Sequence, residues 1–133
     1  DLVLVGPSNP VVSIGPILAV PGIRSALRST PAPVLGFSGI LHGAPVLGMA
    51  HRLLPTIGVA VDAAAVGRHY GARSGTGVLD AWVLDTADAA SAAALEADGL
   101  PTLARDLVMS SPDATAAFVR SAVDEVLGSR GGA

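Results

Sequence analysis

The sequence of 133 residues contains no cysteine and no lysine, since all eight basic side chains are arginine. The lack of cysteine excludes Cys-ligated zinc, iron–sulfur clusters and thiol nucleophiles. The lack of lysine excludes Schiff-base chemistry and a Walker-type phosphate lysine within this chain. The net charge of −3 offers no basic surface, so we expect no nucleic-acid partner. Chemistry here therefore depends on backbone groups, Arg, His, Asp, Ser or Asn.

Charged residues are scarce in the first half of the chain. Only five charged side chains lie in residues 1–67, so we expect this half to be buried. Two uncharged stretches, Leu2–Ile23 and Ser29–His51, have the length of a transmembrane helix, but each contains several prolines that would leave backbone groups unbonded in lipid. No basic segment precedes an apolar core, so no signal peptide is predicted. We expect a cytoplasmic protein that does not enter a membrane.

Strand and helix patterns alternate along the chain. Short apolar runs predict strands at 2–5, 33–37, 78–84 and 100–103, the first of them covered on both faces. Capping residues and apolar spacing predict helices that begin at Ser13, restart over 23–28, and follow at 48–57, 63–70 (capped by Asp62), 87–97 and 112–127 (begun at Ser111). The alternation predicts an α/β protein with a three-layer, Rossmann-like fold and a mainly parallel sheet. Residues 1–127 form the predicted domain, and 128–133 a frayed tail.

The segment Gly6–Gly15 lies between the first predicted strand and the first predicted helix, where α/β proteins bind ligands. Free N–H groups at a helix start, together with the hydroxyls of Ser8 and Ser13, would suit a phosphate or diphosphate. Asn9 is the only side-chain amide of the chain. The same residues also fit a rigid turn capped by Asn9, with Ser13 as an ordinary helix cap. The local pattern leaves both interpretations open.

Three histidines and a Gly-rich run are weaker candidates. His42, His51 and His69 are nine and eighteen residues apart without a carboxylate pair nearby, so we expect no zinc site. His69 is interpreted as a cation at the negative end of a helix dipole. The run Arg73–Gly77 is similar to a phosphate loop but precedes a strand, which favours a flexible connector.

The acidic residues identify no catalytic group. Asp80 and Trp82 are expected on one face of a strand, where Asp80 is either structural, capping a loop, or in contact with a ligand hydroxyl. An ordinary solvated face is predicted for Asp85, Asp88, Glu96 and Asp98. The spacing supports no Ser/His/Asp triad, so the catalytic residues stay unassigned.

The run from Asp1 to Ile23 resembles the central segment of the 2-phospho-L-lactate transferase family, CofD or FbiA, of deazaflavin coenzyme biosynthesis. Four later stretches are similar to the family in the same order, namely 48–50, 67–71, 79–83 and 110–116. The resemblance covers only the C-terminal part of the family's chain. The family's Gly-rich nucleotide-binding segment and its carboxylate-bearing region have no counterpart here, so we expect an incomplete fragment of a larger domain.

The resemblance implies a transferase of coenzyme F(420) biosynthesis. Such an enzyme moves a phospholactyl or phosphoenolpyruvyl group from a guanosine-diphosphate-activated donor to the deazaflavin Fo and releases GMP. The implied partners are Fo and the guanylated phospho acid, with Mg²⁺ held by ligands in the missing N-terminal part and a homodimer at full length. Position and resemblance together assign the nucleotide phosphates to Gly6, Pro7, Ser8, Asn9, Ser13 and Ile14. No metal ligand is assigned within this chain.

One region departs from the family and leaves an alternative open. The resemblance implies Lys and Arg in relatives at the positions of Ala44 and Leu47. The absence of these two cations weakens anion binding unless His42 and Arg52 compensate. The wider superfamily includes YvcK-like gluconeogenesis factors, so the alternative is a noncatalytic nucleotide-sugar-binding regulatory module. A transferase would need Fo and a divalent metal, whereas the module would prefer a uridine diphosphate sugar. The residues do not distinguish a phospholactate from a phosphoenolpyruvate donor.

Overall fold

A four-stranded parallel sheet organises the chain, and the computed structural model describes residues 1–131. The strands are β1 (Val3–Val5), β2 (Val34–Phe37), β5 (Ala81–Asp85) and β6 (Thr102–Arg105), hydrogen-bonded in the order β1-β2-β5-β6. A separate antiparallel hairpin joins β3 (Ile40–Leu41) to β4 (Ala44–Pro45). The predicted α/β class with a mainly parallel sheet is confirmed.

The helices follow the strands as the sequence predicts, with shifted ends. They are η1 (Pro10–Ile14, a π-helix), α1 (Gly15–Ala19), α2 (Ile23–Ser29), α3 (Ala50–Leu53), η2 (Leu54–Ile57), α4 (Ala63–Tyr70), η3 (Thr86–Ser91), α5 (Ala92–Ala97) and α6 (Pro112–Gly131). Two predicted caps are confirmed: Asp62 Oδ1 accepts from the Ala65 N–H at 2.7 Å, and Ser111 Oγ accepts from the Ala114 N–H at 3.1 Å.

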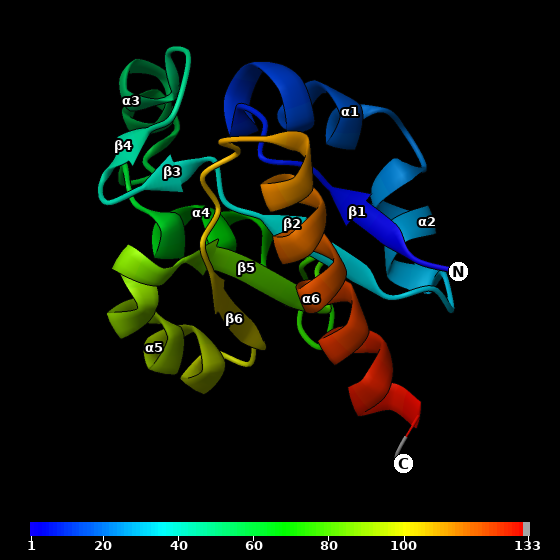
Figure 1. Cartoon of the computed structure of the whole chain (residues 1–133). Coiled ribbons are helices and arrows are strands. Elements are labelled where there is room, and N and C mark those ends of the chain that lie inside the picture. The colour runs from blue at the N-terminus through cyan, green and yellow to red at the C-terminus, as the bar shows by residue number, and fades with distance from the viewer. Residues whose placement is uncertain (132–133) are drawn as a thin grey trace.

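Two apolar cores cover the two faces of the sheet, because alternate strand residues point to opposite sides. Leu35 and Val83 pack with Phe118 of α6, which crosses the front of the sheet in Figure 1. Val34 and Trp82 face the other way, into a core shared with α1, α3, α4 and α5. The predicted three-layer arrangement is therefore confirmed, with α6 alone forming the layer on its face among the described residues.

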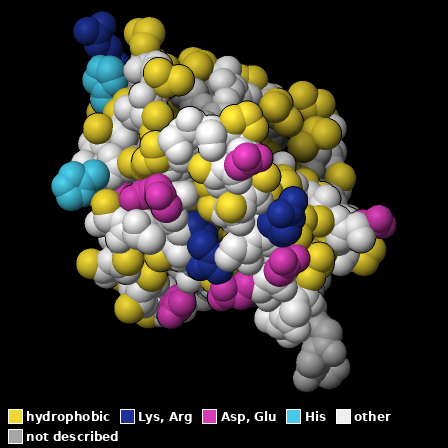
Figure 2. Space-filling view, in the orientation of Figure 1, with side chains coloured by type: hydrophobic (Ala, Val, Ile, Leu, Met, Phe, Trp, Pro, Cys, Tyr) yellow, Lys and Arg dark blue, Asp and Glu magenta, His cyan; other side chains and the backbone are white. Residues whose placement is uncertain are grey.

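The first strand differs from the prediction that both of its faces are covered. β1 lies at the edge of the sheet, and Leu4 is 46% exposed. Val12, Ile17 and Val20 are also more than half exposed, so the charge-poor first half is not uniformly buried as expected. Figure 2 shows hydrophobic side chains gathered at the upper right, over the region of α1. The number of charged residues in a segment does not determine its burial, because burial depends on which elements pack against it. β1 has a neighbouring strand on one side only.

Other differences concern boundaries. Strand β5 begins at Ala81 rather than Val78, because the backbone N–H groups of Val78 and Leu79 bond to the Gly71 carbonyl instead of a neighbouring strand. Helix α6 continues to Gly131, past the predicted end at residue 127, while residues 132–133 lie outside the described part. No single helix within 1–131 is long and apolar enough to cross a membrane; a pair formed by Pro10–Ala19 and Ile23–Ser29 has the length and composition but bends by 82°.

Candidate functional site

A cavity of about 300 Å³ opens at the carboxyl ends of the parallel strands. Its walls come from the loop after β1, the segment after β2 with the β3–β4 hairpin, the start of α3, the middle of α4, and the loop after β6. The lining residues are 7–10, 38–41, 45–47, 50, 66 and 107–109. This edge is where parallel α/β sheets bind ligands, and the predicted loop after β1 forms part of it.

The cavity is mostly apolar. Among the described residues, no Arg, His, Asp or Glu lines it, and Ser8, Asn9 and Ser38 supply its polar side chains. Ser38 is 1% exposed, and its Oγ donates to the Ile40 carbonyl at 2.8 Å while accepting from the Ile40 N–H at 3.1 Å. The Ser38 hydroxyl is thus committed to its own loop, so Ser8 and Asn9 are the polar side chains more readily offered to a ligand.

Asn9 caps the helix that follows it. Its Oδ1 accepts from the N–H groups of Val11 at 2.9 Å and Val12 at 3.2 Å, and its carbonyl accepts from those of Ser13 and Ile14. The N–H groups of residues 11–14 are therefore bonded within the chain, and Asn9 caps the helix as the turn interpretation predicts. The prediction that Ser13 caps the helix is wrong, because Ser13 lies within η1 and the helix already begins at Pro10.

The six residues predicted to bind the nucleotide divide into two groups. Pro7, Ser8 and Asn9 line the cavity. Gly6, Ser13 and Ile14 are not among its lining residues, and Ile14 packs against the core that contains Leu18 and Val66. The first group lies in the loop itself, and the second lies at the strand end and within the helix.

Two carboxylates that were expected on a solvated face, Asp85 and Asp88, instead bond to the backbone around the cavity. Asp85 is only 6% exposed; its Oδ1 accepts from the Ala87 N–H and its Oδ2 from the Leu107 N–H, both at 2.9 Å. Asp88 Oδ2 accepts from the His42 N–H at 2.9 Å. The position of Asp85 directly after a buried apolar run was the available signal, because it marks the carboxyl end of a central strand.

Ala44, one of the two residues expected to depart from the family pattern, lies in β4 of the hairpin, and Leu47 follows the hairpin. His42, with φ of +52°, and Gly43, with φ of +77°, form a two-residue turn between β3 and β4. Leu47 lines the mouth of the cavity and is 89% exposed. His42 and Arg52, named as compensating cations, are exposed and do not line the cavity.

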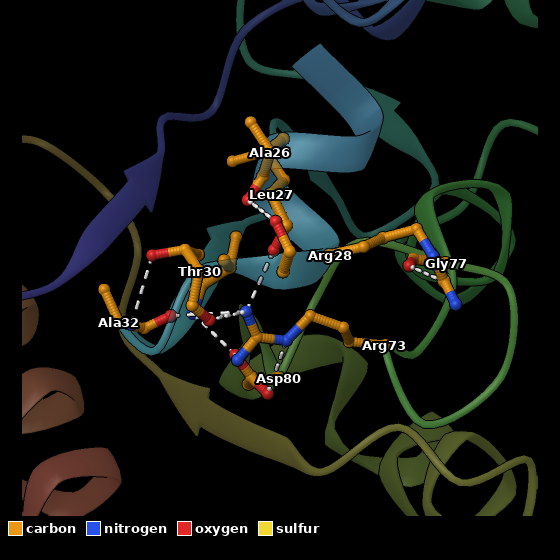
Figure 3. Close-up of polar contacts among 10 residues, drawn as sticks. Ala26, Leu27, Arg28, Thr30, Ala32, Arg73, Gly77 and Asp80 are labelled. Carbon is orange, nitrogen blue, oxygen red and sulfur yellow. Dashed lines mark hydrogen bonds and ion pairs between the residues drawn. The ribbon is translucent and has the colours of Figure 1, made fainter. Parts of the chain in front are cut away.

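A polar network holds the segment before β5 and decides the role of Asp80 (Figure 3). Asp80 Oδ2 accepts from the Val34 N–H at 2.7 Å and lies 2.6 Å from Arg73 Nη2. Arg73 Nη1 also donates to the carbonyls of Leu27 and Thr30 at 2.9 Å and of Ala32 at 3.3 Å. Asp80 therefore has the structural role, one of the two left open.

The run 73–77 is a connector tied down by arginines. Arg28 donates to the carbonyls of Gly77 at 2.6 Å and Gly75 at 2.9 Å, so the loop presents acceptors to a cation. The interpretation of His69 as a cation needs correction: burial lowers its pKa from the ordinary 6.5, and the charge of Arg24 lowers it further. Within the described part of the chain, no group of three or more His, Asp or Glu side chains could hold a metal ion.

Comparisons with known proteins identify relatives of this chain. A family model described as 2-phospho-L-lactate transferase CofD matches residues 1–116. A protein of Nocardia farcinica named phosphoenolpyruvate transferase is 55% identical over 124 residues, which cover 93% of this chain and 36% of that protein. Proteins of the same name from Mycobacterium sp. (strain JLS) and Mycolicibacterium smegmatis are 54% and 52% identical, over 92% and 93% of this chain.

These relatives are much longer than the chain, which spans 36% of the length of each. The matching segment nevertheless includes the parallel sheet, the loop after β1 and every wall of the cavity. Since the family model covers residues 1–116 of 133, the chain belongs to the CofD family.

Proposed function

We propose that this chain forms part of a cytoplasmic transferase of coenzyme F(420) biosynthesis. The enzyme moves a phosphoenolpyruvyl group from a guanosine-diphosphate-activated donor to the deazaflavin Fo and releases GMP. The match to the CofD model over residues 1–116 carries this proposal. The name phosphoenolpyruvate transferase, shared by relatives 52–55% identical, supports phosphoenolpyruvate over phospholactate as the donor. Nothing observed favours the alternative of a noncatalytic nucleotide-sugar-binding module.

The chemistry of the cavity suggests where each of the two substrates binds. Burying a diphosphate in a cavity with no lining cation would cost far more than burying an uncharged ring. A volume of about 300 Å³ lies at the lower end of small-molecule pockets. The ring system of Fo therefore belongs in the cavity, and the nucleotide phosphates belong at its rim, beside Gly6, Pro7, Ser8 and Asn9. Ser13 and Ile14 stay in this proposal only through the helix that they help to build.

The reaction requires orientation more than a strong acid or base. The terminal hydroxyl of Fo would attack the phosphorus of the phosphoenolpyruvyl group, and the bond from this phosphorus to the bridging oxygen would break. GMP would leave with that oxygen, and the hydroxyl proton would pass to solvent water. Negative charge grows on the phosphoryl oxygens, where a positioned donor is most effective. Asn9 Nδ2 is such a donor, since the cap uses only the oxygen of this amide. The catalytic residues stay unassigned.

The expected Mg²⁺ does not fit the cavity. Among the described residues, no carboxylate lines it and no cluster of three possible ligands is present. Ligands outside this chain stay a proposal, as does the homodimer.

The decisive experiment compares Asn9→Ser with Asn9→Ala in the protein expressed from its complete coding sequence. Ser replaces Asn at a helix cap with little loss of stability, whereas Ala costs about 1 kcal/mol. If Asn9 donates to the phosphoryl group, both variants should lose about 10²- to 10³-fold in turnover. GMP release from Fo and the guanylated phospho acid is measured beside a urea midpoint. Turnover by Asn9→Ser close to wild type would make Asn9 only a cap. A wild type that ignores Fo and binds a uridine diphosphate sugar would refute the transferase.

A further inference from the structure

Two carboxylates of one short segment hold two different walls of the cavity. Asp85 ends β5, and Asp88 lies within η3, which follows at once. Asp85 bonds to the backbone of Leu107 in the loop after β6, and Asp88 bonds to the backbone of His42 in the hairpin turn. The segment 85–88 thus connects the hairpin with the loop 107–109.

The Asp85 side chain is buried, and each of its carboxylate oxygens accepts a hydrogen bond. One oxygen fixes the start of η3 through Ala87, and the other fixes Leu107, which lines the cavity and is 5% exposed. Charge-assisted bonds to backbone N–H groups are about twice as strong as neutral ones. The loop 107–109 therefore leaves β6 along a path set by Asp85.

The bond from Asp88 supports an element that has little stability of its own. The hairpin pairs only Ile40 with Pro45 and Leu41 with Ala44, and an isolated two-stranded hairpin is marginal in water. Proline also lacks an N–H to donate. The turn residue His42 has a positive φ, which is unfavourable for a side chain larger than glycine. An external acceptor at the His42 N–H offsets these weaknesses and fixes Leu41 and Pro45 in the cavity wall.

We propose that Asp85 and Asp88 are positioning residues that set the spacing between the hairpin and the loop 107–109, and so the affinity for the apolar ring of the acceptor. The proposal rests on the proposed function. The two carboxylates are expected to affect only one substrate, because they shape the cavity for Fo, whereas the phosphates of the guanylated phospho acid lie at the rim. Loss of either hydrogen bond should weaken the binding of Fo and leave the binding of the guanylated phospho acid unchanged.

The test uses paired substitutions in the protein expressed from its complete coding sequence. Asp88→Ala removes the acceptor of the His42 N–H, whereas Asp88→Asn keeps an oxygen in its place and removes only the charge. Asp85→Asn cannot keep both bonds, because one oxygen becomes an NH2 group that faces a backbone donor. Asp124→Ala, at an exposed site on α6, is the control for loss of a charge.

Steady-state kinetics with Fo and the guanylated phospho acid is the main readout. Asp88→Ala and Asp85→Asn should raise KM for Fo by about fivefold or more and change KM for the donor by less than about twofold. Asp88→Asn should recover most of the loss, and Asp124→Ala should match wild type. Hydrogen exchange at the His42 amide, which needs no ligand, should be faster in Asp88→Ala than in Asp88→Asn.

Each outcome decides one claim. Faster exchange in Asp88→Ala with an unchanged KM for Fo would overturn the positioning role while leaving the transferase intact. Equal rises in both KM values would overturn the restriction to the acceptor. If Asp85→Asn fails to fold, the comparison at Asp88 decides alone. A wild type that neither turns over nor binds Fo would refute the proposed function, and with it the acceptor-specific role.

Discussion

The side chains of Arg73 and Asp80 form an ion pair at 2.6 Å in which they are only 13% and 19% exposed. The pair joins the loop before β5 to α2 and β2, since Asp80 also accepts from the Val34 N–H of β2 and Arg73 donates to the carbonyls of Leu27 in α2 and of Thr30 just after it. Arg68 and Asp98 form a second pair at the same distance, but their side chains are 47% and 52% exposed. The two pairs have the same chemistry in different surroundings.

Arg73→Ala should therefore destabilise the protein by about 3–5 kcal/mol, because it leaves Asp80 largely buried without its cation and three carbonyls without their donor. Arg68→Ala should cost less than about 1 kcal/mol, since an exposed pair is screened by water and salt. Urea midpoints for both variants check the contrast. Similar losses in the two variants would refute the structural role given to the Arg73 network.

Glycine is required at position 77 and not at position 75. A Cβ at Gly77 would lie 2.0 Å from the carbonyl carbon of Gly71, which is backbone and cannot rotate away. A Cβ at Gly75 would meet only the Ala72 oxygen, at 3.6 Å. Gly77→Ala should lower the free energy of unfolding by more than about 3 kcal/mol, whereas Gly75→Ala should be tolerated. Thermal unfolding of the pair tests this, and a stable Gly77→Ala protein would contradict the close approach of the two backbones.

His69 should make stability depend on pH. Folding lowers its pKa, mainly through burial and further through Arg24, so the unfolded chain binds more protons below about pH 6.5. The contribution of His69 is thus present above pH 6.5 and is lost as the pH falls through the lowered pKa. His69→Asn should reduce the difference between urea midpoints at about pH 7.5 and about pH 5. An NMR titration should also show Arg24→Ala raising the pKa of His69; an unchanged pKa would exclude the influence of Arg24.

The exposed apolar side chains of the first half should bind hydrophobic dye or promote self-association. Ile17 is 55% exposed on α1, whereas its neighbour Leu18 is 6% exposed. Ile17→Ser should reduce dye fluorescence or association with little change in stability. Leu18→Ser should lower stability by about 2 kcal/mol or more, because it removes a core side chain and buries a hydroxyl. A wild type that stays monomeric and dye-silent at high concentration would count against the exposed surface.

The sequence predicted the elements well where a local signal was present. Asp62 and Ser111 cap the predicted helices, and the apolar runs at β2 and β5 are buried strands. The predicted loop after β1 does line the cavity, through Pro7, Ser8 and Asn9. Each of these features depends on residues close together in the chain, and such features can be recognised without knowledge of the fold.

The rest depends on contacts between distant residues. Asp85 and Asp88 read as surface residues because their partners, Leu107 and His42, lie 22 and 46 residues away. The edge position of β1 follows from strand order, which no local pattern contains. The hairpin was overlooked because its turn is His42–Gly43 rather than one of the usual Asn-Gly or Asp-Gly pairs.

The pairing of Val3 with Val34 and of Leu35 with Ala81 has a consequence for the order in which the molecule assembles. Each pair of neighbouring strands in the main sheet is separated by a long segment of chain, and proteins with such distant contacts fold slowly. The hairpin can close within about 1–10 microseconds, but on its own it is unstable. Asp88, which accepts from the His42 N–H of the hairpin turn, reaches its position only when β5 and η3 have formed. The cavity should therefore be among the last features to form, with amide protection at His42 appearing after that at Trp82 in a pulse-labelled refolding experiment.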